Sequence, residues 1–157
     1  MNRRKSEIAD LDYNPLTGIF TWRVKVNSRA KAGAVAGSQS RGYWVIRVAG
    51  KLHGAHRLAW FFVYGEWPKQ IDHINGIQSD NRIANLRLAT NAQNAQNSRC
   101  RNRAGFKGVS PKKGKWRATI KHDGRSIQIG TFASPEEAHA AYVAASRRLF
   151  GEFARNG

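Results

Sequence analysis

Two strand-like runs joined by a two-residue turn, with a fully capped helix pattern after them, constrain the fold of this chain more than any other feature. The runs KWRATIKH and RSIQIGTF flank Asp123-Gly124, a dipeptide that favours a tight β-hairpin. The helix pattern has an N-cap, a first-turn proline, a capping box and a glycine beyond its end, at Ser134, Pro135, Glu137 and Gly151. With a further strand over 106–110, the sequence predicts a three-stranded antiparallel sheet packed on one C-terminal helix.

The two faces of this predicted sheet differ in chemistry. Alternation along the central strand separates an apolar set, Trp116, Ala118 and Ile120, from a polar set, Arg117, Thr119 and Lys121. The helix carries a stripe that would cover the apolar face: Ala138, Ala141, Tyr142, Ala145 and Leu149. The basic face is then left exposed, and a twisted sheet of this width can enter the major groove of DNA.

The N-terminal part of the chain follows a different pattern. Residues 11–54 contain short strand-like runs between turns, and a short helix ended by a glycine is expected from Ala55. Residues 70–97 are typical of strand, long loop, strand and helix, and Thr90 and Gln93 fit a capping box at the start of that helix. The sequence therefore predicts a small twisted β-unit followed by a ββα segment.

A basic stretch without apolar periodicity, residues 98–105, separates these two patterns. We therefore expect one domain over 1–97, a basic linker over 98–105 and a second domain over 106–157. The expected fold class is α+β.

Charge indicates the partner of the chain. It has 27 Lys and Arg against 10 Asp and Glu, a formal net charge of +17, and residues 98–157 alone hold 13 of the basic and 4 of the acidic residues. Distributed cations neutralise phosphates and release counterions, so double-stranded DNA is the expected partner. A membrane surface is a weaker alternative, because no apolar stretch approaches the roughly 20 residues that span a bilayer.

Compartment and metal chemistry follow from two further observations. The basic start of the chain lacks the apolar core of a signal peptide, so an intracellular protein is expected. Cys100 is the single cysteine and is interpreted as an incidental exposed thiol, because it has no partner for a disulfide or a zinc site. A metal would therefore be held mainly by oxygen or histidine. Separately, no small-molecule cofactor is expected.

Polar residues in 70–97 make up a candidate catalytic set: Asp72, His73, Asn85 and Asn94. A hard divalent cation takes oxygen ligands and can bridge to a scissile phosphate, so Asp72 and Asn94 are the expected ligands of Mg²⁺. A neutral histidine can take a proton from water near neutral pH, which makes His73 the expected general base. Neighbouring strand residues point to opposite faces, so Asp72 and His73 share a site only if the strand ends or twists there.

The sequence around these residues resembles the His-Asn-His (HNH) endonucleases, particularly phage and homing enzymes with a ββα-metal fold. The resemblance covers about residues 12–97 and rests on YNPLTGIFTW, AHRLAWFF and IDHINGIQSDNRIANLRLATNAQN. It implies Asp72 as a metal ligand, His73 as the base and Asn85 as the catalytic-site residue that braces the loop. It also implies Asn94 as the second ligand, at a position where many relatives have histidine.

Other polar residues of the chain are interpreted more simply. His56 matches a common position in that family, but it has no local partner in the sequence and is expected to be structural. Asn91 and Asn97 are interpreted as a solvated amide face. The remaining histidines are interpreted as surface residues: His53, His122 and His139.

Residues 106–153 resemble the plant Apetala-two/ethylene-response-factor DNA-binding domain, through GFKGV, the strand 116–121, IGTF and SPEEAHAAY. The residues at several of its DNA-contact positions differ here, so its recognised DNA sequence is not carried over. By charge and position, five residues are expected to contact DNA: Lys107, Lys112, Arg117, Lys121 and Arg125.

Two hypotheses follow for the function. The favoured one is a metal-dependent DNA endonuclease of nicking or homing type, a monomer or weak dimer, anchored by its C-terminal sheet. The alternative is a non-catalytic DNA-binding transcriptional regulator with a decayed nuclease fold. The intact catalytic set favours the enzyme, because binding alone does not need it. An RNA-directed enzyme has less support, since the sequence shows no aromatic stacking platform for single strands.

Overall fold

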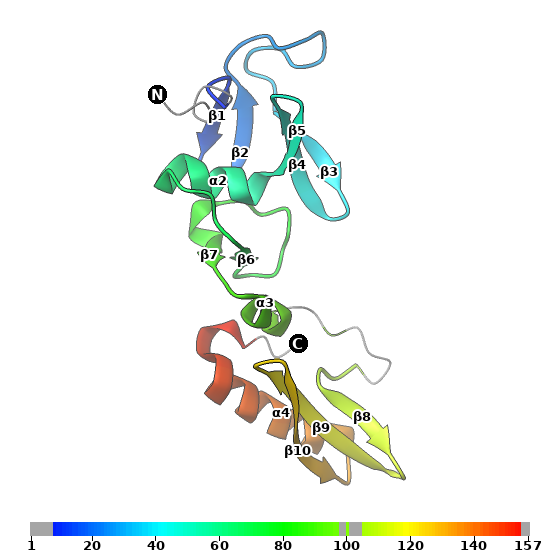
Figure 1. The fold of residues 1–157 in the computed structure, drawn as a ribbon. Helices are drawn as coiled ribbons and strands as arrows, with labels where there is room; N and C mark the ends of the chain where they lie inside the picture. The colour runs from blue at the N-terminus through cyan, green and yellow to red at the C-terminus, as the bar shows by residue number, and fades with distance from the viewer. Residues whose placement is uncertain (1–7, 98–99, 101–104, 155–157) are drawn as a thin grey trace. The chain divides into compact units, whose positions relative to one another are not determined.

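The computed structural model describes residues 8–97, 100 and 105–154, and the chain divides into two compact units, residues 1–88 and 89–157. Figure 1 shows the elements of each unit. In the described residues, unit 1 has three small antiparallel sheets and one α-helix, and unit 2 has a three-stranded antiparallel sheet with the helix α4 against it. The α+β class predicted from the sequence is confirmed.

Unit 1 begins with a hairpin of β1 (Leu11–Asn14) and β2 (Ile19–Trp22). The meander β3 (Ser38–Ser40), β4 (Tyr43–Val48) and β5 (Lys51–Gly54) follows and runs directly into α2 (Ala55–Tyr64). The last pair is β6 (Ile71–His73) with β7 (Leu86–Leu88), and a short 3₁₀ helix, η1 (Ile83–Asn85), comes just before β7.

The core of unit 1 forms around α2. Leu58 of the helix is fully buried together with Phe20 of β2 and Ile46 of β4. Phe62 meets Phe20 edge to face, with ring centroids 5.4 Å apart. The helix ends at Gly65, as the sequence predicted. Gly65 is left-handed, and its N–H donates a hydrogen bond to Phe61 O. One apolar cluster therefore joins both N-terminal sheets to the β6–β7 pair.

Unit 2 begins with α3 (Asn91–Asn97), where Thr90 and Gln93 form the predicted capping box by exchanging hydrogen bonds of 2.7 and 3.2 Å. Its sheet has the order β10 (Arg125–Phe132), β9 (Lys115–His122), β8 (Val109–Lys112), and α4 (Pro135–Phe150) is followed by a short turn, η2 (Gly151–Phe153). The core contains Ala118 and Ile120 of β9, which confirms the predicted apolar face.

The first strand of this sheet starts later than the sequence predicted. β8 begins at Val109, because Gly108 adopts a left-handed φ of 74° and a turn closes between Val109 N and Phe106 O. A Cβ at Gly108 would lie 2.2 Å from the ring of Tyr142, so the turn brings the backbone against α4.

The division between the units lies after Leu88, whereas the sequence predicted a linker over 98–105. Gln96 gives the physical reason why α3 belongs to unit 2. Its side chain accepts a 2.9 Å hydrogen bond from Tyr142 and donates to Lys121 O, and its backbone oxygen accepts from Lys107. Most of the predicted linker, residues 98–99 and 101–104, lies outside the described residues.

Candidate active site

Two consecutive residues at the end of β6 have buried ionisable side chains. Asp72 and His73 are 6% and 5% exposed, which is unusual for such groups unless they are paired. After β6 a turn follows, in which Gly76 N donates to His73 O at 2.7 Å. The strand therefore ends at His73, which still pairs with Leu86 of β7.

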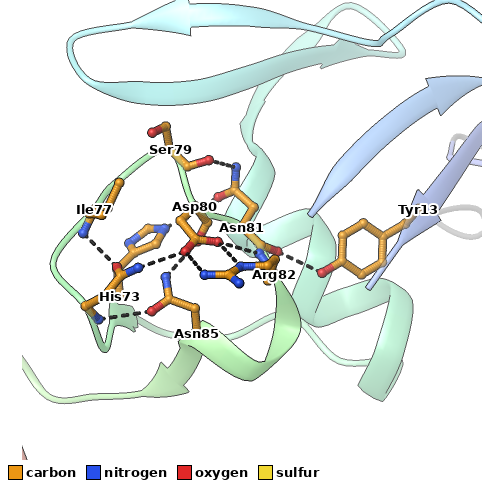
Figure 2. A network of polar contacts seen from close by, with 9 residues as sticks. Tyr13, His73, Ile77, Ser79, Asp80, Asn81, Arg82 and Asn85 are labelled. Carbon is orange, nitrogen blue, oxygen red and sulfur yellow. Dashed lines mark hydrogen bonds and ion pairs between the residues drawn. The ribbon is translucent and has the colours of Figure 1, made fainter. Parts of the chain in front are cut away.

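His73 is held as a neutral ring. Burial lowers its pKa, although a hydrogen bond with Asn81 and the carboxylates of Asp72 and Asp80 act in the opposite direction. Its Nε2 lies 3.4 Å from Asn81 Oδ1, and the amide nitrogen of Asn81 is turned toward Ser79 O at 3.2 Å (Figure 2). Because an amide oxygen can only accept, Nε2 is the donor, and the lone pair of the neutral ring is on Nδ1.

Asn85 ties together the two ends of the loop between β6 and β7. Its side-chain oxygen accepts from Asn75 N at 3.0 Å, and its side-chain nitrogen donates to Asp80 O at 2.8 Å. Its backbone oxygen accepts from Ile74 N at 2.9 Å. A single buried amide thus holds the start and the middle of the loop. These bonds fix the backbone near His73 and next to Asn81.

Asp80 organises the centre of the same loop. It accepts from Asn75 Nδ2 at 2.7 Å and forms a two-point ion pair with Arg82, 2.8 Å from Nε and 2.6 Å from Nη2 (Figure 2). The hydrogen bonds from Arg82 lower the pKa of Asp80 to about 2 despite its partial burial. Asp80 therefore remains an anion, and its hydrogen bonds to Asn75 and Arg82 stabilise the loop.

The loop is also anchored to the first hairpin. Tyr13 of β1 donates its hydroxyl to Asn81 O at 2.8 Å, and Ile83 N donates to Pro15 O at 3.2 Å. Gly18 of the β1–β2 turn comes so close that a Cβ there would lie 2.5 Å from Arg82 N. The N-terminal hairpin therefore supports the segment that positions His73.

Asp72 has a cationic partner that the sequence analysis did not identify. Arg87 lies directly opposite it in the β6–β7 pair and approaches one carboxylate oxygen, Oδ2, through Nε at 2.9 Å and Nη2 at 2.8 Å. The signal in the sequence was the charged residue between the apolar Leu86 and Leu88, but its partner depended on strand register.

His56 was expected to be structural, and the structure places it beside His73. The two rings meet edge to face with centroids 5.2 Å apart, and Tyr43 lies within 6.2 Å of both. Burial, with smaller contributions from His73 and Arg57, lowers the pKa of His56 to about 4. No local sequence signal pointed to this contact, because it joins α2 to β6.

The residues fit a hard cation that keeps several water ligands. Among the described residues, no group of three or more His, Cys, Asp or Glu side chains could hold a metal ion. Asp72 provides one buried carboxylate in unit 1, and the second predicted ligand, Asn94, lies on α3 in unit 2. A single carboxylate such as that of Asp72 suits Mg²⁺, which binds few protein oxygens and retains waters.

The predicted DNA-contact residues of unit 2 lie in different places. Register assigns Lys112, Arg117 and Lys121 to the sheet face opposite the core residues Val109 and Ala118. Arg125 lies at the exposed start of β10, beside the hairpin turn. Lys107 lies off that face, and its ammonium group donates to the backbone of α3.

Comparison with known proteins identifies a similar family over the segment that contains this candidate site. A family model described as HNH endonuclease matches residues 53–96. An uncharacterized HNH endonuclease of Acanthamoeba polyphaga mimivirus is 33% identical over 117 residues, which cover 72% of this chain and 61% of that protein. The chain thus spans less than two thirds of the length of this relative. Residues 53–96, which hold His56, β6, the loop and β7, form an HNH endonuclease domain.

Proposed function

We propose that this chain is a metal-dependent endonuclease that hydrolyses phosphodiester bonds in double-stranded DNA. The observation that carries the proposal is the neutral, buried His73, oriented through Nε2 by Asn81 and adjacent to Asp72. Nδ1 of His73 takes a proton from the attacking water, and the neutral ring is ready to do so near pH 7. Asn85 acts by holding the loop.

Asp72 and Asn94 are the proposed ligands of Mg²⁺. The bound ion supplies charge stabilisation for the scissile phosphate and its leaving oxygen. The catalytic set occurs once per chain, so we expect each monomer to nick one strand, as in nicking or homing enzymes of phage. Such an enzyme acts inside a bacterial or phage-infected cell. Among the described residues, no helix is long and apolar enough to cross a membrane.

Unit 2 is the proposed DNA anchor. Its small sheet with one covering helix suits the Apetala-two-like domain expected from the sequence, and its outer face carries Lys112, Arg117 and Lys121. Basic side chains on an open sheet face match the phosphate backbone and groove of duplex DNA.

A second function is favoured by one observation. The ion pair with Arg87 engages one of the two carboxylate oxygens of Asp72 that could bind a metal, as expected of a nuclease fold that has become a DNA-binding regulator. Cleavage decides between the two functions.

The experiment is conversion of supercoiled plasmid to open-circle DNA by the full chain in Mg²⁺, in EDTA, and after His73→Ala. His122→Ala, at a partly exposed histidine of unit 2, controls for loss of a histidine elsewhere. Metal-dependent nicking that is absent in the His73→Ala and Asp72→Ala proteins but present in the control supports the enzyme. Tight DNA binding by a folded wild-type protein that never nicks refutes it and supports the regulator.

A further inference from the structure

A run of 53 residues in unit 1, positions 13–65, contains no Asp or Glu. They hold these eight basic residues: Arg23, Lys25, Arg29, Lys31, Arg41, Arg47, Lys51 and Arg57. The family model begins at residue 53, so seven of the eight lie outside it. Two have backbone partners, since Arg47 donates to Gly50 O and Arg57 to Pro68 O. The candidate active site uses none of these charges.

Arg41 lies in a tight hairpin turn of this region. It occupies the first position of the two-residue turn between β3 and β4, with φ at 49°, and Gly42 follows with φ at 87°. Two successive left-handed residues make the hairpin turn in which Asn or Asp normally precedes glycine. The same turn recurs at Ala49-Gly50 and Lys113-Gly114, so the conformation alone does not require arginine. What distinguishes Arg41 is an exposed cationic side chain at this turn.

The turn that carries Arg41 lies at the rim of the candidate active site. A Cβ at Gly42 would lie 2.6 Å from Gln78 Oε1, and Gln78 Nε2 donates to the Tyr43 hydroxyl at 2.9 Å. The Tyr43 ring is 6.2 Å from that of His73. The hairpin is therefore packed directly on the loop that positions His73.

The strand beside this turn suits a polyanion. β3 is the outer strand of its sheet, and its side chains Ser38, Gln39 and Ser40 are all exposed. Short polar side chains and the backbone N–H groups of an edge strand allow a sugar-phosphate backbone to approach closely. We call Ser38–Arg41 the β3 edge.

We propose that the β3 edge binds the phosphate backbone of duplex DNA beside the bond to be cut, with Arg41 as its cationic contact. This inference rests on the proposed nuclease function, because only a nuclease has a bond to be cut. The β3 edge gives unit 1 its own contact with the duplex, near His73. Unit 2 supplies a separate DNA-binding face. Arg41 is a positioning residue, since it holds the strand and takes no part in proton transfer.

The test is Arg41→Asn in the full chain, with duplex binding followed by fluorescence anisotropy in EDTA over a range of salt concentrations. Asparagine suits the left-handed turn, so the melting temperature should not fall. Loss of one phosphate contact should raise Kd severalfold and reduce the slope of log K against log salt by about 0.9. Arg41→Lys should keep most of that slope. In Mg²⁺, Arg41→Asn should raise KM for plasmid nicking more than it lowers kcat.

Two controls use the other turn of the same meander, at the opposite end of β4. Ala49→Asn makes the same change of turn residue without a change of charge, and Lys51→Gln removes an exposed charge there. Both should bind DNA like the wild type. The inference is overturned if Arg41→Asn leaves the slope and Kd unchanged, or if Lys51→Gln raises Kd and lowers the slope by as much as Arg41→Asn does. A wild type that binds but never nicks refutes the nuclease, and the binding comparison still decides whether Arg41 contacts DNA.

Discussion

Arg87 and Asp72 face each other across β6 and β7, and Nη2 of the arginine lies 2.8 Å from Oδ2 of the carboxylate. Their side chains are 12% and 7% exposed, so both charges are largely removed from water. In such a pair each charge offsets the desolvation of the other. The carboxylate proposed as a metal ligand is therefore held by a neighbouring cation.

Replacing Arg87 with methionine should destabilise unit 1 strongly. The change leaves Asp72 as an uncompensated buried charge, which costs about 3–5 kcal/mol. Urea unfolding followed by tryptophan fluorescence measures this loss, because four of the five tryptophans lie in unit 1. Arg23→Met is the control: Arg23 pairs with Asp12 at 3.5 Å with both side chains more than half exposed, so a loss within about 1 kcal/mol is expected. Equal losses in the two variants would contradict a buried pair.

Substitution of Gly18 should be far more costly than substitution of Gly33. Both have left-handed φ values, 73° and 78°, so alanine is strained at either position by about 1–2 kcal/mol. Only at Gly18 does the new Cβ meet backbone, 2.5 Å from Arg82 N, whereas nothing lies within 4 Å at Gly33. Gly18→Ala should therefore lose more stability than Gly33→Ala and should also impair nicking, because the loop behind His73 must move. Similar unfolding curves for the two variants would show that the hairpin does not support the loop.

Acid should destabilise unit 1 through His56. Its pKa is about 4 in the folded chain and about 6.5 when unfolded, so the unfolded state binds more protons between these values. The free energy of unfolding should stay level above pH 6.5 and fall by up to about 3 kcal/mol as pH drops from 6.5 to 4. Urea titrations at several pH values measure this. His56→Gln should make the dependence shallower, whereas His122→Gln in unit 2 should not; an unchanged dependence in His56→Gln would exclude His56 as its source.

The sequence predicted what depends on local periodicity and turn chemistry. The hairpin at Asp123-Gly124 and the helix capped at Ser134 are present, because these signals act within a few residues. One capping bond differs, since Glu137 accepts from Ala133 N and not from the N-cap residue. Contacts between distant segments were not predictable: the Asp72–Arg87 pair depends on the register of β6 and β7, and the His56–His73 contact depends on how α2 packs.

The basic side chains of unit 2 should separate into DNA contacts and structural contacts. Arg117 and Lys121 share the outer sheet face, so Arg117→Gln with Lys121→Gln should reduce the salt slope of duplex binding by about 1.8 with little loss of stability. Lys107 was one of the five contacts predicted from the sequence, but its ammonium group donates to Gln96 O and so joins α3 to the turn before β8. Lys107→Met should therefore destabilise unit 2 by about 1–3 kcal/mol and leave the slope nearly unchanged. Anisotropy titrations and thermal unfolding on the same proteins test both expectations. If Lys107→Met instead lowered the slope as much as one outer-face substitution, Lys107 would be a DNA contact, and its bond to α3 would be secondary.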